Sequence, residues 1–423
     1  MIKACLCALI SALLACNHAI ADDSALGGIR SALLPLRPAA VSKGEPQRLP
    51  FNYAGPHQDL RGATPALMTV KHSLRDWIES RLALSDEQID TQALSIQLNG
   101  ELRDTDLLCE APGKARMNRC STASEWQWNG IGYLQAIRLD HQQFGKILIV
   151  RTAVGILCGS DESAYAYEWR DKKWRRFWQS EQEIQPGKVY TPQYLYAVNV
   201  SWPDEKARKR LKLSLGSQGW CSSNFYDVYY RLWQTQSDNS EPKLLLDNAQ
   251  FAYLGQHDPP IIGSVGSNDA LIEFRIPSLD PGVHSYETVR HYRVDGDKLV
   301  RIDPLALSPR DFTEDWLRAS WDESANWTSP NAPPTLKVLH EKVHADYIGG
   351  EYIDDTHHCQ KDPAIWEVGV DFHEKGSAYF LVRWQPPYHF EMVDISEKPR
   401  PDCDQPDTEA DAEHTLFPTQ EYR

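Results

Sequence analysis

With 423 residues, the chain is long enough to bury a sizeable core, and its 41% hydrophobic and 24% charged residues are ordinary for a globular protein. Its formal net charge of −15 argues against nucleic acid as a partner, because phosphates are bound by clustered lysine and arginine side chains. No segment after the N-terminus has about 18 consecutive apolar residues, so no transmembrane segment is predicted.

The N-terminus has the pattern of a secretory signal peptide over residues 1–21. Lys3 precedes an apolar run over residues 4–15, and Ala19-Ile20-Ala21 offers a cleavage site of small residues. We therefore expect a secreted or periplasmic protein. Leu13-Leu14-Ala15-Cys16 also resembles a bacterial lipoprotein box, and a lipid anchor at Cys16 is the alternative.

Six cysteines follow the signal peptide. An even number in an exported chain indicates disulfide bonds, and the spacing leaves their connectivity open. No Cys-x-x-Cys pair suggests a metal site. The disulfide candidates are Cys109, Cys120, Cys158, Cys221, Cys359 and Cys403.

Residues 22–129 are predicted to be an N-terminal lead-in followed by a flank of helix and strand. Residues 22–65 are rich in proline, glycine and alanine and indicate an exposed, partly disordered segment. The apolar residues between Leu74 and Leu84 recur with helical spacing. The alternation in Leu94-Ser-Ile-Gln-Leu98 is typical of a short strand.

Residues 130–307 contain three copies of one β unit. Tyr167, Tyr230 and Tyr292, spaced 63 and 62 residues apart, each begin a hairpin with matching apolar positions. Two further strands precede each tyrosine, so each unit is predicted to have four short antiparallel strands. The fold class expected is mainly β, with tandem four-stranded antiparallel units in a β-propeller-like arrangement and a few flanking helices. An open sheet or a sandwich capped by the flanks is the alternative.

Residues 308–423 are predicted to be a C-terminal helix followed by a β meander that completes the β domain. Ser308 suits the N-cap, and Pro309 suits the first turn. Three strands follow, over residues 366–372, 379–384 and 390–395, with turn signals between them.

The sharpest chemical motif is His340-Glu341-Lys342-Val343-His344. On a helix, His340 and His344 share a face and can both bind zinc, while Glu341 can activate a water molecule. Over about ten residues, this pattern resembles the zincin metalloproteases. Lys342 departs from that family, whose middle positions are uncharged, and no third ligand follows at a suitable spacing. A solvent-exposed amphipathic helix is the structural alternative.

Two other groups of residues are candidates for binding. Asp354-Asp355-Thr356-His357-His358-Cys359 offers carboxylate and imidazole ligands, or else forms an acidic loop with Cys359 in a disulfide. Most of the 14 tryptophans are expected in the core. The tryptophans near loops, which are open to binding, are Trp126, Trp128, Trp220 and Trp327.

The function favoured by these features is that of an exported, non-catalytic binding or interaction protein on a β-repeat scaffold. Its partner is an unknown protein or glycan, and no cofactor is expected. The alternative is a zinc-dependent metallohydrolase in which His340 and His344 bind zinc and Glu341 is catalytic. Neither hypothesis involves nucleic acid as a partner or a segment that spans a membrane.

Overall fold

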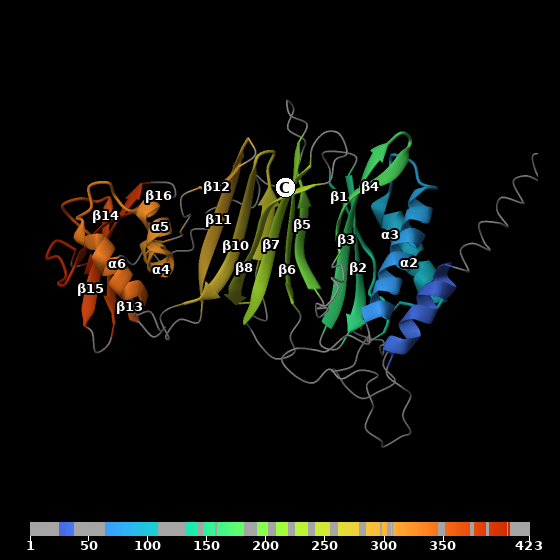
Figure 1. Ribbon diagram of the computed structural model, residues 1–423, viewed down its shortest axis with the longest axis horizontal. Coiled ribbons are helices and arrows are strands. Elements are labelled where there is room, and N and C mark those ends of the chain that lie inside the picture. The colour runs from blue at the N-terminus through green and yellow to red at the C-terminus, as the bar shows by residue number, and fades with distance from the viewer. Residues whose placement is uncertain are drawn as a thin grey trace, which may run out of the picture. The chain divides into compact units, whose positions relative to one another are not determined.

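The computed structural model of the chain is shown in Figure 1. The signal-peptide region, Cys16 and the four cysteines from Cys109 to Cys221 lie outside the described residues. The described residues are 25–37, 64–108, 132–142, 147–156, 159–181, 193–201, 209–218, 225–235, 242–253, 261–278, 285–296, 298–302, 306, 308–345, 352–372, 376–385, 389–403 and 405–406.

The described strands form four antiparallel sheets in tandem, and each takes its main strands from one continuous stretch of chain. The sheets have the strand orders β1-β2-β3-β4, β5-β6-β7-β8, β12-β11-β10-β9 and β16-β15-β14-β13-β17. This confirms the predicted fold class of tandem four-stranded units with flanking helices. Closure into a propeller stays a prediction. None of the described helices has the length and apolar character needed to cross a membrane.

Contacts divide the chain into two compact units, which are described separately. Unit 1 comprises Met1–Val198 and Gly216–Ser223, and unit 2 comprises Asn199–Leu215 and Asn224–Arg423. The division passes through the second sheet, whose strands are β5 (Gln193–Val200), β6 (Arg210–Gln218), β7 (Phe225–Thr235) and β8 (Lys243–Tyr253).

The first sheet, in unit 1, packs against helices that come before it in the chain, as the blue and green elements of Figure 1 show. The third and fourth strands of this sheet form a hairpin that turns at Asp171 and Lys172, both with positive φ, where the repeat pattern predicts a turn. The elements of unit 1 are η1 (Leu34–Leu36), α2 (Thr64–Leu82), α3 (Thr91–Asp104), β1 (Arg138–Gln142), β2 (Ile147–Ile156), β3 (Gly159–Arg170) and β4 (Lys173–Ser180).

Two sequence expectations for the N-terminal flank are wrong. The segment Leu94-Ser-Ile-Gln-Leu98 lies inside helix α3, with Leu94 and Leu98 buried and Ile96 exposed. Residues 25–33, expected in an exposed lead-in, are helical, and Leu26, Ile29 and Leu33 are buried in the core of unit 1. Both segments bury apolar residues three or four positions apart, which is the helical spacing.

A fully buried ion pair joins helix α2 to the first sheet. Lys71 Nζ lies 2.8 Å from an Asp161 carboxylate oxygen, and both side chains are almost completely removed from solvent. A buried charge is stable only when it is paired, so the helix and the sheet depend on each other here.

The third sheet belongs to unit 2 and packs against β7 and β8, the strands of the second sheet that lie in the same unit. The ring of Tyr230 in β7 lies 5.9 Å from that of Phe274 and 6.5 Å from that of Tyr292. The repeat tyrosines Tyr167, Tyr230 and Tyr292 are all buried in the third strand of their sheets, as the repeat predicts. The strands of this sheet are β9 (Ile261–Val265), β10 (Asp269–Pro277), β11 (Ser285–Asp295) and β12 (Lys298–Arg301).

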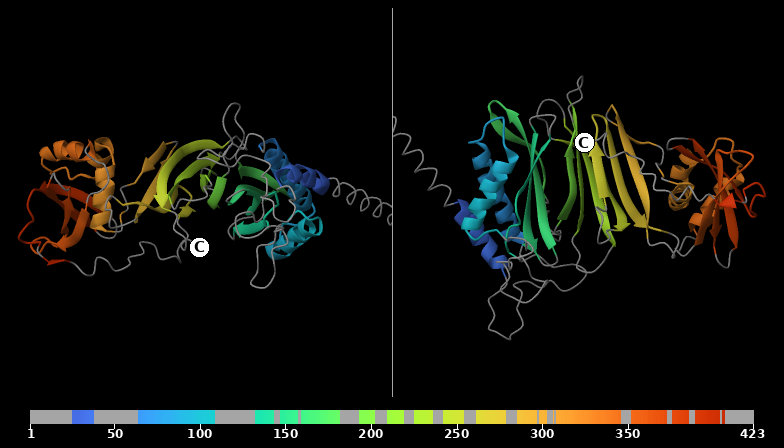
Figure 2. Two further views of the ribbon diagram at one scale, coloured as in Figure 1. Left: turned by 90° about the horizontal axis from the view of Figure 1, so that it is seen from below. Right: turned by 180° about the vertical axis from the view of Figure 1, so that it is seen from behind.

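The fourth sheet carries the C-terminal helices on one face, as the orange and red elements of Figure 2 show. Phe312 stacks on Phe390, and Trp316 packs edge-on against Phe380. The elements are α4 (Pro309–Arg318), α5 (Trp321–Ser324), η2 (Ala325–Trp327), α6 (Thr335–Ala345), β13 (Tyr352–His358), β14 (Ile365–Asp371), β15 (Ser377–Gln385), β16 (His389–Ser396) and β17 (Gln405–Pro406).

Helix α4 begins as its sequence predicts. The Ser308 hydroxyl accepts a hydrogen bond from the Asp311 backbone N–H, and Pro309 occupies the first turn. The helix contacts β11 of the third sheet and four strands of the fourth. It therefore lies between the third and fourth sheets of unit 2.

Candidate functional site

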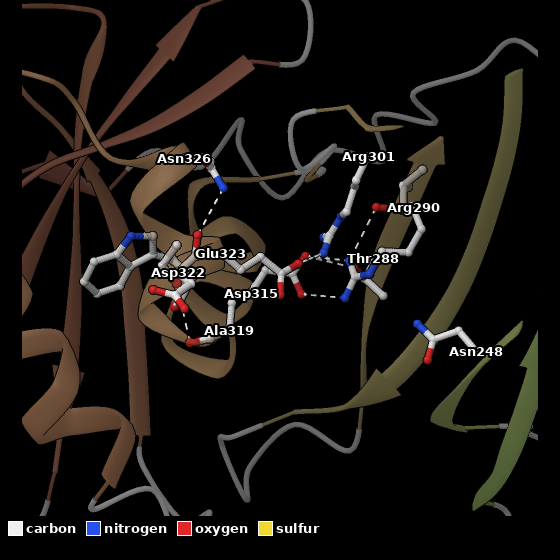
Figure 3. Close-up of polar contacts among 12 residues, drawn as sticks. Asn248, Thr288, Arg290, Arg301, Asp315, Ala319, Asp322, Glu323 and Asn326 are labelled. Atoms are coloured by element: carbon white, nitrogen blue, oxygen red, sulfur yellow. Dashed lines mark hydrogen bonds and ion pairs between the residues drawn. The ribbon is translucent and has the colours of Figure 1, made fainter. Parts of the chain in front are cut away.

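A cluster of charged side chains, two buried and two partly exposed, lies where the third sheet meets helices α4 and α5 (Figure 3). We call it the arginine junction, and define it as Arg290, Arg301, Asp315 and Glu323. Alternation along β11 directs Thr288, Arg290 and Tyr292 to one face of the sheet. The pairing of Tyr292 with Arg301 brings the second arginine to the same face from β12.

Asp315 is the acceptor at the centre of the arginine junction. Its carboxylate receives hydrogen bonds from Arg290 at 2.9 and 3.3 Å, from the Tyr286 hydroxyl at 2.8 Å and from the Thr288 hydroxyl at 2.9 Å. Burial alone would raise the pKa of Asp315, but the adjacent Arg290 brings it below its ordinary value. The carboxylate is therefore ionised and fully used by these four bonds.

Arg301 is bound less completely than Arg290. Its Nη1 donates to the Glu323 carboxylate, and its guanidinium carbon lies 4.8 Å from the centre of the Trp327 ring. Within the described part of the chain, its Nε and Nη2 are buried without a hydrogen-bond partner. Burial, followed by repulsion from Arg290, lowers the pKa of Arg301 to about 10. The surroundings thus disfavour its positive charge.

Phenol and amide groups form one side of the arginine junction. Tyr230 and Tyr292 lie close enough to Arg301 for their hydroxyls to influence its pKa. Asn248, an exposed residue of β8, donates a hydrogen bond to the Tyr230 hydroxyl at 2.8 Å. A line of polar groups therefore runs from the surface at Asn248 towards the two arginines.

The His-Glu-x-x-His motif lies on helix α6, against the C-terminal end of α4. His340 Nε2–H donates to the Trp316 carbonyl at 3.0 Å, and His344 Nδ1–H donates to the Leu317 carbonyl at 3.1 Å. These carbonyls belong to the last turn of α4, whose groups lack partners within the helix. The two imidazoles, stacked with ring centres 5.6 Å apart, cap that helix end.

The Glu341 side chain takes no part in the hydrogen bonds that the two imidazoles make with α4. Its side chain is half exposed, and a carboxylate oxygen lies 3.7 Å from Lys337 Nζ, one turn earlier on α6. No group of three or more histidine, cysteine or acidic side chains within the described ranges is arranged to hold a metal. Each bond to α4 uses one ring nitrogen and leaves the other, so what the motif lacks for zinc within the described ranges is a third ligand.

The second polar cluster of the sequence forms strand β13 and the turn after it. His358 donates to the Pro363 carbonyl at 2.8 Å, and His357 pairs with Glu367 in the neighbouring strand. Cys359 forms a disulfide with Cys403, which agrees with the expectation of disulfide bonds. This bridge fastens the segment after β16 to the end of β13.

Sequence reasoning missed all four residues of the arginine junction and named only Trp327, which packs against Arg301. Trp327 was a binding candidate because it lies near a loop, and the structure buries it beside Arg301. Two signals were present in the sequence. Arg290 alternates with Thr288 and Tyr292 on a buried strand face, and Asp315 adjoins Trp316 on a helix expected to dock on a sheet.

No family model matches the chain, and no curated protein matches it.

Proposed function

We propose that the protein is an exported, non-catalytic binding or interaction protein whose tandem β sheets act as a scaffold. The main support for this proposal is the set of contacts that the His-Glu-x-x-His motif makes. His340 and His344 each donate a ring N–H to a carbonyl that ends α4, while Glu341 faces Lys337. These bonds give the two imidazoles a helix-capping role, which supports a motif that is structural rather than catalytic.

The scaffold supports binding rather than chemistry in a second way. Asp315 is enclosed by Arg290 and two hydroxyl donors, which leaves it no acceptor capacity for a reacting group. Scaffolds of repeated sheets present loops and strand edges for recognition, and sites on such surfaces need only to bind. The signal-peptide pattern of residues 1–21 supports export.

The test is metal analysis of the purified full chain, with His344→Ala and Lys337→Ala as a matched pair on the same helix. We expect substoichiometric zinc in the parent protein and in both variants. We also expect His344→Ala to lower stability by about 1 kcal/mol through loss of one helix-capping bond. Stoichiometric zinc that is lost in His344→Ala and kept in Lys337→Ala would overturn the proposal in favour of a zinc-dependent metallohydrolase.

A further inference from the structure

Arg301 has an unused hydrogen-bonding edge. Its Nε and Nη2 lie on the same side of the planar guanidinium, and neither has a partner in the described part of the chain. This edge is the one that binds a carboxylate through two parallel hydrogen bonds.

The other contacts of Arg301 fix the edge in place. Glu323 holds Nη1, and Trp327 lies over the guanidinium. The Asp315 carboxylate cannot supply the missing acceptors, because Arg290, Tyr286 and Thr288 already use it. The charge of Arg301 is therefore held in a fixed orientation with two donors unsatisfied, which is a costly state for a buried group.

The charge of the arginine junction limits the ligand. Two arginines face two carboxylates, so the four side chains are formally neutral. A ligand with one negative charge adds an acceptor for Nε and Nη2, while a doubly charged phosphate places more negative charge beside Asp315 and Glu323. The Arg301 side chain is 22% exposed, so the junction reaches solvent although the two nitrogens themselves are covered.

We propose that the Nε and Nη2 edge of Arg301 binds the carboxylate group of a small ligand, with Glu323 and Trp327 holding the guanidinium in position. This inference names a ligand class for the proposed binding function and rests on it. Entry of the ligand requires a local opening over the two nitrogens.

The test is a ligand-observed NMR titration of the full chain with propionate, and with propionamide as a neutral analogue of the same shape. We expect propionate to bind and propionamide not to bind. Arg301→Lys keeps the charge but lacks the two-donor edge, and we expect it to bind propionate about tenfold more weakly. Arg275→Lys is the matched control, because Arg275 lies in the same sheet and is paired with Glu287. Its affinity should equal that of the parent protein.

Glu323→Gln gives a second test that unfolding cannot imitate. The glutamine side chain keeps an oxygen that accepts from Nη1 but lacks the negative charge, so the guanidinium stays in position and propionate should bind more tightly than to the parent protein. Equal binding of propionate and propionamide, no binding of propionate, or unchanged affinity in either Arg301→Lys or Glu323→Gln would overturn the inference. Tighter binding of inorganic phosphate, followed in parallel, would overturn the choice of a carboxylate. Zinc content tests the proposed function separately, so failure of one is distinguishable from failure of the other.

Discussion

Replacing Asp315 by asparagine should strongly destabilise unit 2. Asparagine keeps the shape of the side chain but has one acceptor oxygen, so at least two of the four hydrogen bonds at this carboxylate are lost. Hydrogen bonds to charged groups contribute about 1.5–3 kcal/mol each, and removal of one partner from a buried ion pair costs about 3–5 kcal/mol. We therefore expect Asp315→Asn to lower the free energy of unfolding by about 3–5 kcal/mol.

Urea unfolding followed by tryptophan fluorescence measures this loss, and hydrogen exchange of the β11 amides places it in unit 2. Glu287→Gln is the control, because Glu287 lies in β11, the strand that carries Arg290, and forms a partly exposed ion pair with Arg275. Its expected cost is below about 1 kcal/mol. Combining Asp315→Leu with Arg290→Met should cost less than Asp315→Asn alone, because no buried charge is left unpaired. A loss below about 1 kcal/mol in Asp315→Asn would refute this reasoning.

The effect of Asp315 should also depend on pH. Its pKa is lowered in the folded protein, so its stabilising contribution is complete above the unfolded value of about 3.9. The contribution is lost as the pH falls through the folded pKa. The difference in stability between the parent protein and Asp315→Asn should therefore shrink in acid, which urea unfolding at a series of pH values would measure.

Three further predictions concern other parts of the structure. Removing the disulfide with Cys359→Ala and Cys403→Ala should cost about 4 kcal/mol in urea unfolding, because the cysteines lie 44 residues apart, and an unchanged free energy of unfolding would contradict this. Lys71→Met should lower the midpoint of thermal unfolding sharply, because it leaves the buried Asp161 carboxylate without its cation. The further change Asp161→Leu should recover part of that loss, and a midpoint lower in the double variant than in Lys71→Met would contradict this. Burial lowers the pKa of His340, so stability should fall as the pH drops below about 6.5, where the unfolded chain binds the extra proton. His340→Asn should lose that part of the pH dependence, and an unchanged stability profile would argue against it.

The tandem sheets were predictable because their signals are local or repeated. Tyr167, Tyr230 and Tyr292 keep a nearly constant spacing, and the structure places each in the third strand of its sheet. The start of α4 was predictable because Ser308 and Pro309 act within one turn. The apolar alternation around Leu94 was too short to separate a strand from a helix, and burial every four residues decides for the helix.

The arginine junction was not predictable because its partners are far apart in sequence. Arg290 and Asp315 are separated by 25 residues, and the local sequence around either residue does not indicate that the other is its partner. The His-Glu-x-x-His motif has the spacing of a zinc site, and that spacing equally lets two imidazoles on one helix face reach the end of another helix. Spacing places two side chains together, but the neighbouring element decides what they bind.

Helix α4 makes the last repeat dependent on chain beyond its own end. Asp315 is the carboxylate that balances Arg290, yet it comes after the third copy of the repeat is complete. A truncation at the end of β12 would remove both the carboxylate that pairs with Arg290 and the helix that covers this face of β11, so the duplicated segment and the smallest segment able to fold are different lengths of chain.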